Sequence, residues 1–322
     1  MSIKALAMRD AFLECIYHEM KSDNTIFFVS ADFGSPVLDK IRNDFPSRFT
    51  NVGIAEQNLI NISAGLALEG FKVFAYAIAP FITMRCFEQI RVSLALLSEV
   101  RPMNVNLIGV GAGYSYVVSG PTHQCYEDLT LMRALPNFQL LSPSDHITAI
   151  SLFEECVGSS GPKYLRFDAQ ILPVIYESFK PKISDGFHVH NQGKKVCIIA
   201  TGFMMHTALK VLDEISKEGV NIGLIDIFNL TNFNTNKLES ILSSYSGLIS
   251  IEEGFRGRGG LDSMLFEFSS RRNLDIQILN IGVEPGYSFE LGTRSELHEK
   301  VGIGIHSILS QIRLFLIKFK LL

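Results

Sequence analysis

The alternation of short apolar runs with helical segments constrains the fold of this chain most. Three short runs are mostly apolar, at residues 25–30, 71–78 and 105–110. Three segments with helical spacing accompany them, at residues 8–20, 59–68 and 81–97. Strands without polar alternation are buried on both faces, as in a parallel sheet covered by helices. The alternation therefore predicts an α/β fold with a doubly wound sheet.

A second alternating unit follows a break in this periodicity. Pro173, Pro181 and Lys182 interrupt the periodicity near residues 174–186. Beyond it we expect strands at 195–201, 221–226 and 247–252 and a helix at 205–217. A length of 322 residues also favours two domains over one. We therefore predict two doubly wound domains, at 1–178 and 186–322.

The composition argues against several classes of protein. Hydrophobic residues make up 47% and charged residues 19%, which suits packed cores rather than disorder. The net charge is −4 and no run of Lys or Arg occurs, so neither nucleic acid nor an anionic membrane is an expected partner. No apolar stretch approaches the roughly 20 residues that span a bilayer. The start of the chain, residues 1–4, lacks the apolar core of a secretory signal.

The five cysteines are scattered, odd in number and never spaced as Cys-x-x-Cys. This distribution predicts neither a disulfide framework nor a metal site in the chain, and a reducing cytoplasm is the expected compartment. Residues 314–322 form a short apolar tail. We expect a last helix that packs on its own domain or on a partner, in preference to a membrane anchor.

Three stretches contain candidate functional residues, although each has an ordinary structural explanation. Residues 51–58, Asn-Val-Gly-Ile-Ala-Glu-Gln-Asn, place Glu56 near the start of a helix, where an acid most often stabilises the helix dipole at the surface. Residues 119–124, Ser-Gly-Pro-Thr-His-Gln, place His123 in a loop after a buried strand, where open α/β sheets bind ligands. A lone His there is more often structural. Residues 81–91 alone would indicate a core helix.

Taken together and in this order, these stretches resemble the transketolase superfamily. The segments Gly-Ile-Ala-Glu-Gln, Gly-Pro-Thr-His-Gln and Leu-Ser-Pro-Ser-Asp (residues 141–145) are similar to family motifs, and residues 251–254 resemble the start of a C-terminal domain motif. The resemblance covers nearly the whole chain. Within the superfamily, the chain looks most like transketolases and 1-deoxyxylulose-5-phosphate synthases. It implies a pyrimidine-binding domain followed by a transketolase C-terminal domain, with thiamine diphosphate as cofactor.

The resemblance also implies roles for individual residues. Glu56 matches the carboxyl group that activates the aminopyrimidine of the cofactor, and an apolar cleft favours the protonated form of such a group. His123 matches a histidine near the reacting carbon, with proton transfer as its role. Four residues match cofactor-binding positions: Phe81, Phe87, Asp32 and Met84, the last where transketolases tend to place a stacking Phe.

The substrate pocket departs from the family pattern. Arg9 resembles an arginine that binds substrate phosphate, and Ser119 stands where an acid contacts a sugar hydroxyl. An expected Arg falls on Ala169 and an expected His on Gly111, while Arg166 lies close enough to compensate. Arg and His are natural partners of a phosphate dianion. The small residues Ala169 and Gly111 are also expected to enlarge the pocket. The acceptor is therefore expected to be an unphosphorylated or nucleotide-linked sugar.

The chain contains no Gly-Asp-Gly, the family's motif for magnesium and the diphosphate. We therefore expect a separate partner subunit that carries Gly-Asp-Gly and a downstream Asn and ligates Mg²⁺, in an α2β2 heterotetramer. The expected activity is transfer of a two-carbon ketol unit from a ketose to a sugar acceptor, only with that partner. Alternatives are a 1-deoxyxylulose-5-phosphate-synthase-like enzyme, a 2-oxo acid decarboxylating acyloin synthase or dehydrogenase β subunit and, least favoured, a non-catalytic paralogue.

Overall fold

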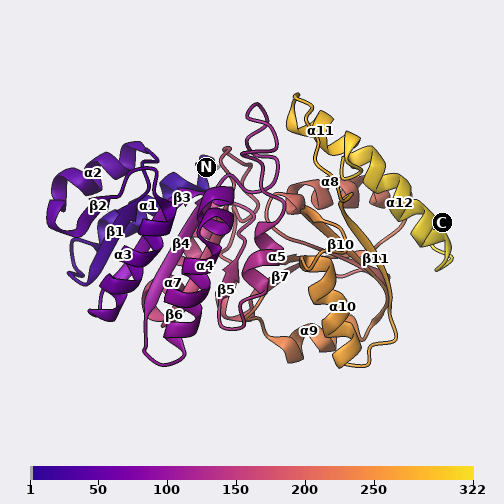
Figure 1. Cartoon of the computed structure of the whole chain (residues 1–322). Helices are drawn as coiled ribbons and strands as arrows, with labels where there is room; N and C mark the ends of the chain where they lie inside the picture. Colours follow the sequence, from indigo (N-terminus) through magenta and orange to yellow (C-terminus); the bar gives the residue numbers. More distant parts are fainter. Residues whose placement is uncertain (1–2) are drawn as a thin grey trace.

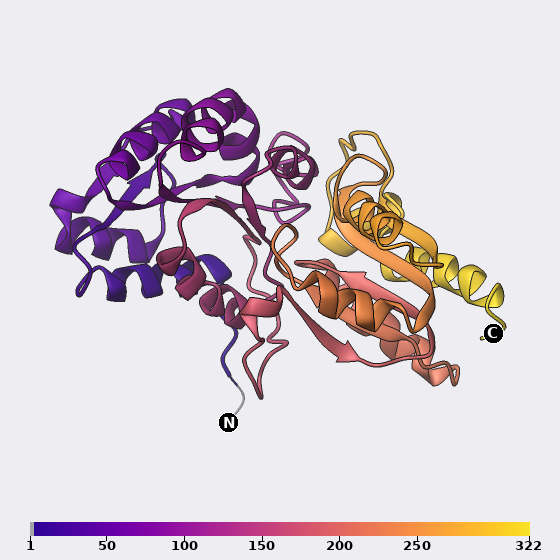
Figure 2. The same cartoon turned by 90° about the horizontal axis from the view of Figure 1, so that it is seen from below.

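The first sheet of the computed structural model has six parallel strands in the order β2-β1-β3-β4-β6-β5. The model describes residues 3–322, so the first two residues of the N-terminal stretch considered above lie outside it. The strands are β1 (Ile26–Ser30), β2 (Phe49–Asn51), β3 (Lys72–Ile78), β4 (Asn104–Val110), β5 (Gln139–Leu141) and β6 (Gly161–Phe167). This sheet and its helices form the first of the two lobes that lie side by side in Figures 1 and 2.

Helices cover both faces of this sheet, as the apolar runs predicted. Alternate residues of β3 enter two different cores: Val73 and Ala75 pack with one cluster, Phe74 and Tyr76 with the other. The first cluster includes α3 (Glu56–Leu68) and α5 (Asp128–Arg133). The second includes α1 (Met8–Glu19), α2 (Pro36–Asp44), α6 (His146–Ser151) and α7 (Phe153–Gly158).

The predicted helix at 81–97 is helical but not regular. Two wide, π-helical segments, η2 (Phe81–Arg85) and η3 (Ile90–Leu96), flank the short α4 (Phe87–Gln89). Side chains bind backbone carbonyls one turn back: Thr83 Oγ1 donates to the Ala79 carbonyl at 2.7 Å, and the Cys86 thiol to that of Ile82 at 2.8 Å. Such π turns are rare and occur frequently at functional sites. Two 3-10 turns, η1 (Pro46–Arg48) and η4 (Ile183–Asp185), lie elsewhere.

The second sheet has the order β11-β10-β8-β9-β7. It consists of β7 (Phe187–Asn191), β8 (Lys195–Ala200), β9 (Gly223–Ile227), β10 (Tyr245–Phe255) and β11 (Gln277–Val283). All neighbours are parallel except the edge strand β7, which runs antiparallel to β9. The doubly wound prediction is therefore confirmed for this lobe, with one antiparallel edge.

Five helices flank the second sheet: α8 (Met204–Lys217), α9 (Thr235–Leu242), α10 (Leu261–Arg271), α11 (Arg294–Lys300) and α12 (Ile305–Ile317). The apolar tail prediction is confirmed in that α12 buries Phe315 and Leu316 in its own domain, although Leu314 and Ile317 stay exposed. Within residues 3–322 no single helix is long and apolar enough to cross a membrane, whereas α11 and α12, bent by 41°, meet that test only as a pair, by length and composition.

Backbone hydrogen bonds join the two sheets directly. The Ser142 N–H donates to the Phe228 carbonyl at 2.8 Å, and the Leu230 N–H donates to the Leu140 carbonyl at 2.9 Å. One apolar cluster also runs across the joint, because it contains both Leu140 and Leu230. The two lobes therefore share part of their core.

A buried carboxyl group lies at the same joint. Asp226 of β9 accepts hydrogen bonds from Ser144 Oγ at 2.5 Å and Tyr176 Oη at 2.8 Å, both on the same carboxylate oxygen. Its other oxygen has no partner among residues 3–322. Burial raises the pKa of Asp226 to about 7. The group therefore retains its proton in the folded chain at pH values where the unfolded chain has released it.

We expect Asp226→Asn to reduce the pH dependence of stability. The folded pKa of about 7 exceeds the unfolded value of about 3.9, so this group's contribution is full below pH 4 and declines as the pH rises towards 7. The decline is on the order of 4 kcal/mol at most. Urea unfolding at pH 5 and pH 8 measures it: the free energy of unfolding should fall less in the variant. An equal fall in both proteins would contradict the prediction, and the exposed Asp213→Asn serves as control.

Candidate active site

Glu56 is a buried acid at the first position of α3. The loop before it turns at Gly53, whose φ of +75° favours glycine, and the side chain of Glu56 is only 3% exposed. Arg85 Nη1 of η2 donates to Glu56 Oε2 at 2.7 Å. These two residues line a cavity of about 370 Å³ with Ile54, Ala55, Gln57, Asn58 and Asn61. The burial excludes the ordinary role of a surface acid at a helix start.

Asp32 supports the loop that leads to Glu56. It follows β1 with a φ of +50°, and its backbone N–H donates to Asn51 Oδ1 at 3.0 Å. The Asn51 amide donates back to Asp32 Oδ1 at 3.0 Å, while Asn51 Oδ1 also accepts from the Gly53 N–H. The ends of two adjacent parallel strands are thus joined just before the acid, at the edge where open α/β sheets bind ligands.

His123 approaches the same place from a loop of the first domain. A pair of backbone hydrogen bonds between Gly113 and Cys125, at 2.9 and 3.0 Å, closes this loop, residues 113–125, at its base. The His123 ring lies edge-on to Phe81, with centroids 5.3 Å apart, and Thr122 Oγ1 lies 3.0 Å from its Nδ1. The Arg85 guanidinium lies over the same Phe81 ring, 4.5 Å from its centroid.

The structure therefore brings Glu56, Arg85, Phe81 and His123 together, and two other candidates have different surroundings. Met84 is 38% exposed, with its side chain at the surface. Phe87 lines a different cavity of about 220 Å³, together with Arg91 and Leu96. Their assignment as cofactor-binding residues stays a prediction.

The three substrate candidates have different surroundings. Arg9 is part-buried and its guanidinium is held by its neighbour Asp10, with nitrogen–oxygen distances of 2.7 and 3.2 Å. Ser119 is exposed, and its carbonyl accepts from Thr122 at 3.5 Å. Arg166 is 2% exposed: its Nε donates to Asp128 at 2.8 Å and its Nη2 to the Glu253 carbonyl at 3.1 Å. This enclosure favours the alternative role of Arg166, a structural ion pair, and its assignment to substrate binding stays a prediction.

The expectation of an enlarged pocket needs correction. Gly111 has a φ of +104°, and a Cβ built on it would overlap the ring of Tyr116. Ala169 packs against the core of the first domain. These small residues therefore leave no open space at this end of the pocket. Tyr116 fills the space beside Gly111, and its ring also lies 6.4 Å from that of His123.

No group of three or more His, Cys, Asp or Glu side chains in residues 3–322 could hold a metal ion.

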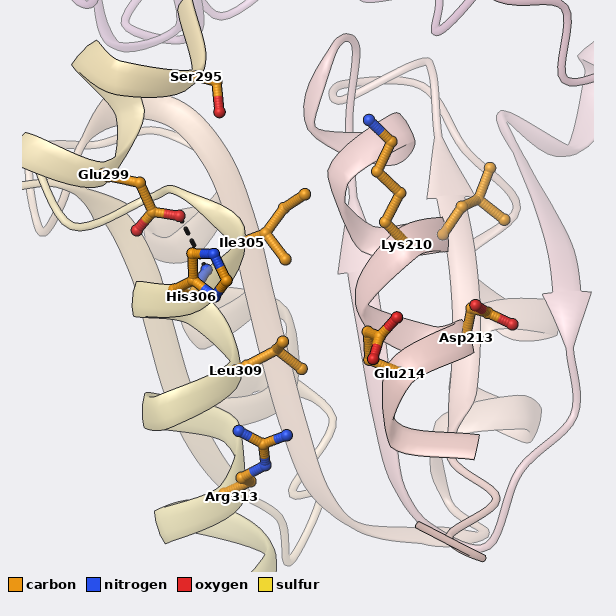
Figure 3. Close-up of a pocket in the computed structure, with 10 residues that line it drawn as sticks. Lys210, Asp213, Glu214, Ser295, Glu299, Ile305, His306, Leu309 and Arg313 are labelled. Carbon is orange, nitrogen blue, oxygen red and sulfur yellow. Dashed lines mark hydrogen bonds between the residues drawn. The ribbon is translucent and has the colours of Figure 1, made fainter. Parts of the chain in front are cut away.

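A larger cavity, of about 780 Å³, lies in the second lobe, between α8 and the α11–α12 pair (Figure 3). Its charged groups are mostly engaged: Arg313 pairs with Glu218, and Glu299 accepts from the His306 N–H at 2.8 Å. None of the sequence-predicted residues lines it.

Comparison with known proteins follows the same division into two domains. The family model for the transketolase pyrimidine-binding domain matches residues 4–174, and that for the transketolase C-terminal domain matches residues 186–308. The chain belongs to the transketolase family. The family implies thiamine diphosphate as the cofactor of this transketolase-type subunit.

Individual relatives include both short and long proteins. One subunit of an apulose-4-phosphate transketolase from Actinobacillus succinogenes is 28% identical over 82% of this chain and 84% of its own length. A putative transketolase C-terminal section from Methanocaldococcus jannaschii is 28% identical over 95% of both chains. Human transketolase-like protein 2 is also 28% identical, but only 47% of it is covered.

A solved structure has the same architecture over almost its whole length. It is a split-gene transketolase described as an inactive beta4 tetramer, with a TM-score of 0.84, 28% identity and coverage of 96% of this chain and 98% of that one. The chain is thus similar to one subunit of a split transketolase and to about half of a full-length member such as the human relative.

The residues around Glu56 fit the implied cofactor. A buried carboxyl group, the Phe81 ring and a cavity open to the surface are the features that an aminopyrimidine requires. Sequence reasoning missed Arg85 and Tyr116 as neighbours of the two candidate catalytic residues. Arg85 stands within the family-like stretch 81–91, but only the π turn of η2 shows that it faces Glu56.

Proposed function

We propose that this chain is the pyrimidine-binding subunit of a split transketolase, which transfers a two-carbon ketol unit from a ketose to a sugar acceptor. The observation that carries the proposal is the burial of Glu56 at the start of α3, beside a cavity and paired with Arg85. The Arg85 guanidinium lies over the Phe81 ring, and the His123 ring contacts that ring edge-on. Glu56 would hold the aminopyrimidine ring by a hydrogen bond and share a proton with it. His123 would exchange protons with substrate oxygens. Bound thiamine diphosphate would supply the electron sink for breaking the carbon–carbon bond.

A partner subunit would complete the site by binding the diphosphate and Mg²⁺. In support, the relative from Actinobacillus succinogenes is by its name one subunit of a transketolase, and the similar split-gene structure is described as inactive. The cavity beside Glu56 is also open on one side and lined by exposed Ile54 and Gln57, as expected for a site closed by another chain. An α2β2 heterotetramer is the proposed form.

The purified chain alone is expected to turn over no substrate, because half of the cofactor site would be missing. Activity should appear when the chain is reconstituted with a partner that carries Gly-Asp-Gly and a downstream Asn, with thiamine diphosphate and Mg²⁺ present. A ketose donor and a 2-oxo acid donor should be compared in the same assay. Robust carbon–carbon bond transfer by the single chain would refute the split site, and turnover of the 2-oxo acid alone would replace ketol transfer by decarboxylation.

We expect the reconstituted complex to prefer an acceptor other than a short sugar phosphate. Arg9, the remaining phosphate candidate, is already paired with Asp10, and Arg166 is enclosed by Asp128 and a carbonyl. The Arg and His that the family pattern places at positions 169 and 111 are also absent. Losing two charge-assisted hydrogen bonds to a phosphate corresponds to about 3 to 6 kcal/mol, or a loss of about a hundredfold or more in affinity for the sugar phosphate. The measurement compares kcat/KM for ribose 5-phosphate with that for unphosphorylated and nucleotide-linked sugars. Efficient use of ribose 5-phosphate would contradict the prediction.

A further inference from the structure

A buried cluster of charges joins the C-terminal domain to the base of the loop that carries His123. Glu253 lies in β10, where the pairing with β11 shifts register between Ile251 and Phe255. Such bulges re-aim side chains. The Glu253 carboxylate is 1% exposed and points into the first domain, where its Oε1 accepts a hydrogen bond from the backbone N–H of Tyr114 at 3.1 Å.

The position of Glu253 is fixed from its own domain. Arg294, at the start of α11, donates to both carboxylate oxygens at 3.0 and 2.7 Å, and His298, one turn later, lies 2.6 Å from Oε1. Burial alone would raise the pKa of Glu253, but Arg294 and His298 outweigh burial and hold the pKa well below its usual range. Glu253 is therefore a stable anion with a fixed geometry.

Arg294 also reaches the first domain on a second path. Its Nη1 donates to Asp168 at 2.6 Å, directly after β6. The last residue of β6, Phe167, accepts with its carbonyl from the N–H groups of Gly111 and Ala112, which lead into the loop. The Arg294 guanidinium thus contacts both supports of the loop. One is the end of β6, which binds the residues that lead into the loop, and the other is the Glu253 carboxylate, which binds the base of the loop.

The base of the loop is closely packed. A Cβ on Gly113 would overlap the Glu253 carboxylate. Tyr114 is buried against Tyr126, with ring centroids 4.8 Å apart, and against His298 at 5.4 Å. Because Gly113 and Cys125 close the loop, holding Tyr114 holds the base of the segment on which His123 stands.

We infer that Glu253 and Arg294 are positioning residues for the proposed reaction, and that one task of the C-terminal domain is to hold the His123 loop. The catalytic part of this inference rests on the proposed function. Neither residue lines the cavity beside Glu56, so their effect on the reaction is indirect, through the placement of His123. Small misplacements of a reacting group are enough to slow catalysis strongly.

The first test compares Glu253→Leu with Glu253→Gln by hydrogen exchange in the purified chain. Leu removes the acceptor of the Tyr114 N–H, whereas the amide oxygen of Gln keeps it. We expect amides of residues 114–124 to exchange at least about tenfold faster in Glu253→Leu, and Glu253→Gln to lie near the native protein. Glu218→Gln, in the exposed pair with Arg313, is the matched control and should change nothing. Unchanged loop exchange in a folded Glu253→Leu would overturn the inference.

A second pair of variants tests the same contact without removing a charge. Gly113→Ala and Gly219→Ala both place a side chain at a positive φ, but only the first collides with Glu253, since Gly219 faces open space. In the reconstituted complex, Gly113→Ala should lower kcat about tenfold or more and leave cofactor affinity within about twofold. The control Gly219→Ala should change neither kcat nor cofactor affinity. This pair carries the test if Glu253→Leu does not fold.

Equal effects of Gly113→Ala and Gly219→Ala would overturn the inference, as would a parallel loss of cofactor affinity and turnover in Gly113→Ala. The exchange measurement also separates this inference from the proposed function. Faster loop exchange in Glu253→Leu, in a chain whose native complex shows no ketol transfer, would remove the proposed function and leave the support of the loop by the C-terminal domain in place.

Discussion

Glu56→Gln is expected to lower turnover of the reconstituted complex by two to four orders of magnitude, roughly the range for groups that transfer protons. The substitution changes almost nothing else. The amide oxygen of Gln can still accept the hydrogen bond from Arg85, and the side chain keeps its volume in a site that is 3% exposed. What it loses is the ability to share a proton with a bound ring nitrogen.

The measurement is steady-state turnover with saturating thiamine diphosphate, beside the melting temperature and the subunit composition of the complex. Glu88→Gln is a matched control, because Glu88 lies on the neighbouring α4 but is 68% exposed and forms an ion pair with Arg91 rather than Arg85. The control should retain native turnover. Near-native turnover by Glu56→Gln, with the partner and cofactor supplied, would refute the assignment of Glu56.

The second large effect is expected from His123→Ala, with a fall in turnover of about a hundredfold or more. The His123 ring lies against Phe81, and its Nδ1 is near Thr122 Oγ1, which leaves Nε2 for a substrate oxygen. Cofactor affinity should change by less than about threefold, because no contact of His123 lies within the cavity beside Glu56.

Separate titrations of cofactor binding and of substrate turnover distinguish these two quantities. His306→Ala, an exposed histidine on α12, is the control and should match the native protein in both. Native turnover combined with strongly weakened cofactor binding would reverse the role of His123, from the reaction to the cofactor.

The architecture was predictable because a strand that is buried on both faces is recognisable in the sequence as a mostly apolar run. The apolar runs that became β3 and β4 are apolar because helices cover both sides of them. The short strands β2 and β5, of three residues each, carry too few residues for any periodicity. The antiparallel direction of β7 depends on its pairing with β9, which local pattern does not encode.

The candidate site was predictable only in part. Glu56 and His123 stand in motifs that resemble a family, so the sequence places them without geometry. Arg166 shows the limit of this reasoning: an arginine at a strand end suits a substrate or an ion pair equally, and its observed partner Asp128 is 38 positions away in the sequence. The contacts of Glu253 and Arg294 could not be predicted from the sequence either, because their partners Tyr114 and Asp168 lie in the other domain.

The joint between the two sheets bears on how the chain unfolds. Backbone hydrogen bonds cross it at residues 140–142 and 228–230, and one apolar cluster contains residues from both sides. Separating the lobes would strand these amides and expose that cluster to water, at a cost that neither lobe recovers alone. The two domains that the sequence motifs distinguish should therefore unfold together, and the chain should melt in a single transition. A cut near residue 180 should yield two unstable fragments rather than two folded domains.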